Sequence, residues 1–109
     1  MIDQLLEILE NSEGIYSAFV LDRENELNTI NEEKFNEDSA HAELVETLLP
    51  VIRTLKEFKS LNVTLCSFEY EKHTCNIYLN DKLSLTIIYN NADEFEKIEP
   101  IVKEILEAI

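Results

Sequence analysis

Two histidines and two cysteines are the residues of this 109-residue chain best suited to metal binding or nucleophilic catalysis. His73 and Cys75 are two positions apart in a predicted strand, so both side chains would point to one side of the sheet. A structural zinc site needs four ligands at characteristic spacings, and neither a CxxC nor an HxxxH motif accompanies this pair. His41, near Ser39, has no neighbour that would orient it as a catalytic base. We therefore expect a structural histidine, a core thiol, an exposed His41, and neither a metal site nor a catalytic triad.

Phosphate-binding loops are excluded by composition. The chain has one glycine, whereas Walker and dinucleotide-binding loops need several glycines for the backbone to approach phosphate. Neighbouring carboxylates give no evidence of acid–base catalysis, because 23 acidic residues in 109 make such pairs unavoidable. We predict a protein that is not an enzyme and that binds no cofactor.

The charge balance limits the classes of partner. Twenty-three acidic and nine basic residues give a formal net charge of −14, which repels nucleic acid and anionic membrane surfaces. The same charge favours a basic partner, although an ordinary solvated surface also explains it. The start of the chain is acidic, unlike a signal peptide, and no apolar run is long enough to span a membrane. We expect one compact cytoplasmic domain spanning residues 1–109, without membrane insertion.

Residues 61–90 organise the chain, because alternating apolar side chains predict three consecutive strands there. The predicted turns are residues 69–72 and residues 80–82. The third strand, residues 83–89, is apolar or β-branched on both faces and should be covered on both sides. Together these strands predict an antiparallel meander with helices on each face.

The register of the first two of these strands decides where the thiols lie. A four-residue turn places Cys66 opposite Cys75. A three-residue turn aligns Leu65 with Ile77 and places the two thiols on opposite faces of the sheet. We favour the three-residue turn, with both thiols buried and reduced.

The first half of the chain predicts a helix, a hairpin and a second helix. Apolar residues at helical spacing fill the first dozen positions, and Gly14 should end that helix in a left-handed conformation. Residues 15–21 and 27–31 read as two strands, with Asn25 at a position of positive φ between them. After a charged connector, Asp38 or Ser39 should cap a long helix that kinks at Pro50 and whose apolar stripe is too wide for one contact surface.

The chain should end in a helix. Residues 91–93 resemble an N-terminal cap, and apolar residues recur at helical spacing from Phe95 to Ile109. Pro100 leaves two alternatives open. It lies either inside one continuous helix or near the first position of a main helix that follows a separate turn.

The complete order predicts an α+β fold, a five-stranded antiparallel sheet sandwiched between helices in the order α-β-β-α-β-β-β-α. With this order, the segments GIYSAFVLDRENEL and NDKLSLTIIYN resemble the roadblock family, which includes dynein light chains and regulators of small GTPases. The resemblance extends over essentially the whole chain. Asn25 stands where members of the family often have a turn glycine.

The resemblance implies a noncatalytic, homodimeric binding platform of profilin-like architecture that binds and regulates or localises a small Ras-like GTPase. Long helices of two subunits would lie side by side, and the strand at residues 61–68 would pair with its copy. The implied dimer interface comprises Leu44, Leu48, Ile52, Leu55, Val63 and Leu65. The implied partner-binding residues are His41, Glu43, Glu46, Thr47 and Arg53. Alternatives with the same fold are a small-ligand sensory domain and a structural subunit of a larger assembly.

Overall fold

A computed structural model describes residues 2–22, 24, 26–30, 39–57, 64–70 and 72–109, with the side chains of residues 39–42 and 70 left out. The expected α-β-β-α-β-β-β-α order is confirmed. Its elements are α1 (Ile2–Glu10), β1 (Ile15–Asp22), β2 (Leu27–Thr29), α3 (Ser39–Glu57), β3 (Leu65–Tyr70), β4 (His73–Leu79), β5 (Leu83–Tyr89) and α4 (Ala92–Ala108).

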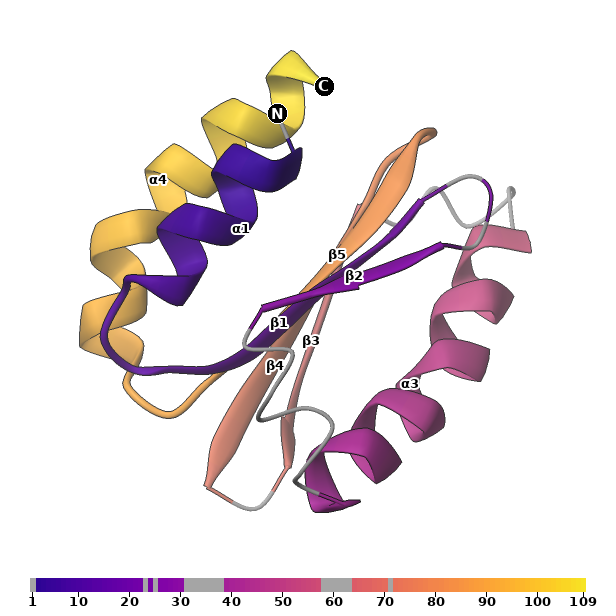
Figure 1. The fold of residues 1–109 in the computed structure, drawn as a ribbon, viewed down its shortest axis with the longest axis horizontal. Coiled ribbons are helices and arrows are strands. Elements are labelled where there is room, and N and C mark those ends of the chain that lie inside the picture. Colours follow the sequence, from indigo (N-terminus) through magenta and orange to yellow (C-terminus); the bar gives the residue numbers. More distant parts are fainter. Residues whose placement is uncertain (1, 23, 25, 31–38, 58–63, 71) are drawn as a thin grey trace.

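The strands form one five-stranded antiparallel sheet in the order β2-β1-β5-β4-β3. Helices α1 and α4 lie side by side on one face, and α3 crosses the other face (Figure 1). The sheet therefore separates two hydrophobic cores. All seven residues of β5 are buried, which confirms that this strand is covered on both faces.

Within each strand, every second side chain points into one core and the side chains between them point into the other core. The core beneath α1 and α4 comprises Leu5, Leu9, Ala18, Val20, Ile30, Tyr78, Leu83, Leu85, Ile87, Tyr89, Phe95 and Val102. The core beneath α3 comprises Phe19, Leu21, Val45, Leu48, Ile52, Cys75, Ile77 and Ile88. Alternation along β1, β4 and β5 sends successive side chains to different cores, as period-two patterning requires.

Gly14 joins α1 to β1 in the predicted left-handed conformation, with φ of 81°. A Cβ atom at this position would lie 3.0 Å from the Cβ of Asn91 and 3.3 Å from that of Glu94. The Gly14 carbonyl also accepts a hydrogen bond from the Asn90 amide at 3.0 Å. This glycine thus allows both the turn and the close approach of the segment that begins α4.

The predicted register of β3 and β4 is wrong by one residue. Leu65 pairs with Tyr78, not with Ile77, and Tyr70 pairs with His73, so two residues connect the strands instead of three. Cys66 consequently pairs with Ile77 and lies on the same face as Cys75, beneath α3. The physical reason is that a one-residue change in turn length moves every side chain of one strand to the other face.

The second turn of the meander agrees with the prediction. Asn80 Oδ1 accepts hydrogen bonds from the amides of Lys82 at 2.7 Å and Leu83 at 2.9 Å. The Asn80 amide donates to the Leu83 carbonyl at 3.1 Å, which closes the turn. An asparagine side chain is suited to this role because it imitates a backbone turn.

Both proline-containing helices are continuous. Helix α3 includes Pro50, and α4 includes Pro100, so the structure favours the single-helix alternative for the C-terminal segment. Asn91 caps α4, as predicted, by accepting a hydrogen bond from the Glu94 amide. The predictions for Asn25 and the 31–37 connector lie outside the described residues.

Candidate protein-interaction surface

Helix α3 has an inner face that is buried against the sheet and a lateral flank that is apolar. Val45, Leu48 and Ile52 are between 0% and 3% exposed, because their spacing places them on the inner face. Val51 is 43% exposed, whereas Leu44 and Leu55 are half-buried. Since Leu44, Val51 and Leu55 are seven and four positions apart, they form one stripe along the flank. This α3 flank is the apolar surface of the helix that the sheet does not cover.

The structure divides the predicted dimer-interface residues into three groups. Leu48 and Ile52 belong to the intrachain core, and this use follows from their position beneath the helix axis. Leu44 and Leu55 lie on the α3 flank, and Val63 is outside the described residues. Leu65 is 45% exposed, but its pairing with Tyr78 places its side chain on the side of the sheet away from α3.

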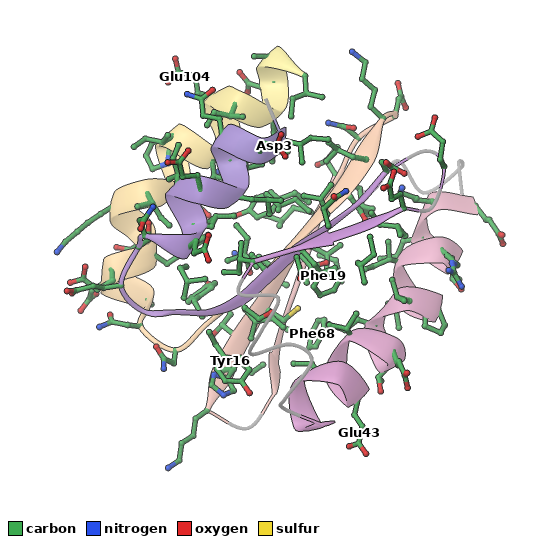
Figure 2. The ribbon with its side chains drawn as sticks, viewed as in Figure 1. Asp3, Tyr16, Phe19, Glu43, Phe68 and Glu104 are labelled. Atoms are coloured by element: carbon green, nitrogen blue, oxygen red, sulfur yellow. The ribbon has the colours of Figure 1, made fainter. Side chains whose placement is uncertain are left out.

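The predicted partner-binding residues are exposed where their side chains are described. Glu43, Glu46, Thr47 and Arg53 all lie on the solvent side of α3. Figure 2 shows Glu43 pointing away from the molecule near the start of the helix. The Thr47 hydroxyl donates a hydrogen bond to the Glu43 carbonyl at 2.8 Å, so the proton of this hydroxyl is already engaged within the helix. The His41 side chain is not among those described.

Strand β3 lies at one edge of the sheet and, among the described residues, pairs only with β4. The Leu79 amide donates to the Thr64 carbonyl at 2.9 Å, which shows that Thr64 faces β4. Backbone groups alternate in direction along an antiparallel strand, so those of Leu65, Ser67 and Glu69 point outward. We call these outward backbone groups the β3 edge. The sequence pattern did not reveal this edge, because it identifies a strand but not the position of that strand in the sheet.

The β3 edge and the α3 flank border the same core. Cys66 and Phe68 of β3 and Leu44 of α3 all pack against the core beneath α3. An exposed strand edge can pair with another chain, and an exposed apolar helix flank gains free energy when a partner covers it. The two features together form a candidate surface for a second protein chain.

A chain of hydrogen bonds links β3 to α4 on the opposite face. Ser67 Oγ donates to Asn76 Oδ1 at 2.6 Å, Asn76 Nδ2 donates to Tyr78 Oη at 3.3 Å, and Tyr78 Oη donates to Glu99 Oε2 at 2.9 Å. Burial raises the pKa of the Tyr78 phenol above its ordinary value, and the Glu99 carboxylate raises this pKa further. The phenol is therefore a hydrogen-bond donor at neutral pH and fixes α4 over the sheet. In the sequence, the only indication of this hydrogen-bond chain is that polar residues alternate with apolar ones in β3 and β4.

Beside this hydrogen-bond chain, a groove opens between the end of the β3–β4 pair and the C-terminal half of α4. Its volume is about 410 Å³, and its lining residues are Thr64, Leu65, Tyr78, Leu79, Asn80, Lys103, Leu106 and Glu107. We call it the α4 groove. The side chains of Leu65 and Leu106 give it an apolar surface, whereas the side chain of Leu79 packs against the core beneath α3. Lys103 and Glu107 provide the charged groups of the groove.

Neither the thiols nor the acidic residues form a candidate metal site in the described part of the chain, where no three histidine, cysteine or carboxylate groups come together. Burial raises the pKa of the Cys75 thiol to about 12, and the nearby Cys66 contributes to this increase. Cys75 is therefore a protonated core residue at neutral pH and a poor nucleophile. Within the described residues, no helix is long and apolar enough to cross a membrane.

The two helical layers carry different charges. Helices α1 and α4 carry nine carboxylates and two lysines, and both lysines have a carboxylate partner, Glu94 for Lys97 at 3.0 Å and Glu99 for Lys103 at 3.8 Å. Helix α3 carries three carboxylates, one arginine and one lysine. The α3 layer is thus close to neutral, whereas the α1/α4 layer is strongly acidic. A second copy would meet less repulsion at α3 than at α1 and α4.

A scan against known protein families finds no matching family, and a search of curated protein sequences finds no matching protein.

Proposed function

We propose that this protein is a noncatalytic, homodimeric binding platform for a small Ras-like GTPase, which it regulates or localises in the cytoplasm. The observation that carries the proposal is the outward β3 edge bordering the same core as the apolar, nearly neutral α3 flank. The resemblance of the sequence to the roadblock family supplies the class of partner, and the α+β order of the chain agrees with that resemblance.

In the proposed dimer, the β3 edges of two copies pair antiparallel and the α3 flanks pack side by side. A twofold axis near Ser67 would place the outward groups of Leu65 opposite those of Glu69 in the other copy. Leu44, Val51 and Leu55 are seven and four positions apart, so they lie on one side of the helix, where a second helix could pack against them. Leu48 belongs to the core, so Val51 takes its place in our revised interface.

The dimer is tested by Val51→Asp and by Glu69→Pro, because the first places a charge in the α3 flank and the second removes an outward amide from the β3 edge. The chain mass is 12.7 kDa, so light scattering should give twice this mass for the unchanged protein and 12.7 kDa for each variant. Ile101→Asp is the matched control, since Ile101 of α4 is 45% exposed and Val51 is 43% exposed. A monomeric unchanged protein, or two variants that remain dimeric, would contradict the proposed interface.

The GTPase is tested by affinity capture from a lysate of the source cell, with GDP or a GTP analogue present. The unchanged protein should recover a small GTPase in amounts that depend on the nucleotide. A Glu43→Lys, Arg53→Glu double variant should recover less, because both side chains are exposed on α3 and their charges are reversed. Recovery of other proteins only would favour the structural-subunit alternative and contradict GTPase binding.

A small-ligand sensor is the second candidate function, and the α4 groove is the observation in its favour. Its volume of about 410 Å³ is in the range of small-molecule sites, and most of its lining surface is apolar. A set of small apolar metabolites screened by thermal shift tests this function. Stabilisation that is lost in Leu65→Ser would support it over the platform.

A further inference from the structure

The α4 groove combines an apolar interior with acidic surroundings, and this combination defines what it can bind. Leu65 is 45% exposed although it is a large aliphatic side chain, and Leu106 is half-buried. An apolar side chain inserted between these two leucines would remove their remaining surface from water, which is favourable in proportion to the area covered. The interior of the groove therefore selects an apolar anchor.

The charged residues around the groove determine whether the ligand groups beside that anchor should be cationic or anionic. Lys103 Nζ lies 3.8 Å from Glu99 Oε1, so a carboxylate partner already offsets this cation. Glu107 is exposed and has no ion pair among the described residues. Glu104 occupies the outer side of α4 in Figure 2, and the whole chain carries a net charge of −14. An anionic ligand would be repelled, whereas a cationic ligand would be attracted.

The floor of the groove is fixed before any partner arrives. Tyr78 is 6% exposed, and its hydroxyl is held by Asn76 and Glu99 through hydrogen bonds of 3.3 and 2.9 Å. The neighbouring turn is closed by Asn80, whose side-chain oxygen accepts two backbone hydrogen bonds. A site whose walls are already ordered loses less conformational entropy when it binds.

We propose that the α4 groove binds a basic peptide segment of a partner protein, with a leucine-like anchor between Leu65 and Leu106 and with lysine or arginine facing Glu107. This site is independent of the proposed GTPase platform, because it lies on the face of the sheet away from α3. It also leaves the outward backbone groups of β3 unused, so a dimer that pairs through the β3 edge can bind peptide at both grooves.

Fluorescence anisotropy with a labelled peptide of sequence Lys-Lys-Leu-Leu-Lys-Lys tests the proposal. The unchanged protein should bind it saturably, and a peptide with serines in place of the leucines should bind at least about fivefold more weakly, which corresponds to ~1 kcal/mol. Leu65→Ser and Glu107→Lys should each weaken binding of the leucine peptide by a similar factor. Light scattering on each sample separates an effect on the groove from an effect on the oligomeric state.

Two controls are matched to these variants. Ile101→Ser removes an aliphatic side chain with the same 45% exposure from the same layer, and Glu57→Lys makes the same charge change on α3. Both should leave the affinity within about twofold of the unchanged protein. Equal weakening by Glu57→Lys and Glu107→Lys would show attraction to the whole acidic protein and would overturn the proposed site. Absence of saturable binding, or equal binding of the serine peptide, would overturn it as well.

Discussion

Two hydroxyl groups are buried in the core beneath α3 without a hydrogen-bond partner in the described structure. Ser84 and Thr86 of β5 are both 0% exposed, and neither Ser84 Oγ nor Thr86 Oγ1 has a partner there. They alternate with Leu85 and Ile87 of the opposite core, so both point toward α3. A buried hydroxyl without a partner loses its hydrogen bonds to water, which costs about 1–3 kcal/mol.

Thr86→Val should therefore stabilise the protein. Valine has nearly the same shape as threonine but no hydroxyl to desolvate, so we expect the free energy of unfolding to rise by about 1 kcal/mol in urea denaturation. Thr54→Val is the control, because the Thr54 hydroxyl is exposed and donates to the Pro50 carbonyl at 2.8 Å. A loss of stability in Thr86→Val would show that the hydroxyl has a partner in solution.

Cys75 links stability to alkaline pH. Burial raises its pKa from 9.0 in the unfolded reference to about 12 in the folded protein. A raised folded pKa means that the native state holds the proton more tightly than the unfolded state. This contribution is fully present below about pH 9 and is lost as the pH rises toward 12.

Cys75→Ala should accordingly reduce the dependence of stability on pH. The variant should be less stable than the unchanged protein at pH 7 because it leaves a cavity, but its unfolding free energy should fall less steeply between about pH 9 and 11. Guanidinium denaturation at several pH values measures this slope. Ile77→Val is the control, since it also removes core volume but no titrating group. If Cys75→Ala keeps the slope of the unchanged protein, the thiol does not contribute to it.

At the scale of the element, the apolar residues of α3 form two surfaces with different roles, a buried inner face and the partly exposed α3 flank. Ile52 is 0% exposed and packs in the core, whereas its neighbour Val51 is 43% exposed. Adjacent residues of a helix point about 100° apart, so the boundary between core and flank falls between them. Substitutions at these two positions separate folding from association.

Ile52→Ala should lower the unfolding free energy by about 2–5 kcal/mol, because it removes buried methyl groups and leaves a cavity. Val51→Ala should change the stability of the monomer by no more than about 0.5 kcal/mol. Both are measured by urea denaturation at a protein concentration where light scattering shows monomers. Equal destabilisation by the two substitutions would mean that Val51 is also part of the intrachain core.

Local signals in the sequence predicted most of the fold. Gly14 has the left-handed conformation predicted between α1 and β1, Asn91 caps α4, and the doubly apolar pattern of residues 83–89 identified the central strand. The register of β3 was predicted incorrectly, since strands of either register show the same alternation and only the turn length distinguishes them. Pairing between sequence-distant strands, such as β1 with β5, was not predicted, because no local signal in the chain identifies it.

The candidate surface was less predictable than the fold. Helical periodicity revealed that the stripe of α3 was too wide for one contact, but the predicted interface included Leu48 and not Val51. Which of the two faces the sheet depends on how the helix is rotated, and the tertiary contacts determine this rotation. The α4 groove was not predicted, because it joins Leu65 to Leu106 across the fold and a pattern read along the chain does not bring them together.

At the scale of the whole molecule, the negative charge is unevenly distributed between the two layers. Helix α1 carries Asp3, Glu7 and Glu10 but no basic residue, and it packs beside the acidic α4. Glu10 is also the last residue of α1, where the partial negative charge at the helix C-terminus repels a carboxylate. Repulsion within this layer should therefore oppose folding, in contrast to the nearly neutral α3 layer.

Glu10→Lys should stabilise the protein by about 0.5–1 kcal/mol at low ionic strength, because it reduces repulsion in the α1/α4 layer and places a cation at the end of α1. Glu46→Lys makes the same change in net charge but lies within the nearly neutral α3 layer, so its gain should be smaller. Since salt screens exposed charges, the difference between the two variants should largely disappear at about 0.5 M sodium chloride. Thermal unfolding at low and high salt measures both effects. Equal gains from the two variants at low salt would show that net charge, and not its distribution between the two layers, limits stability.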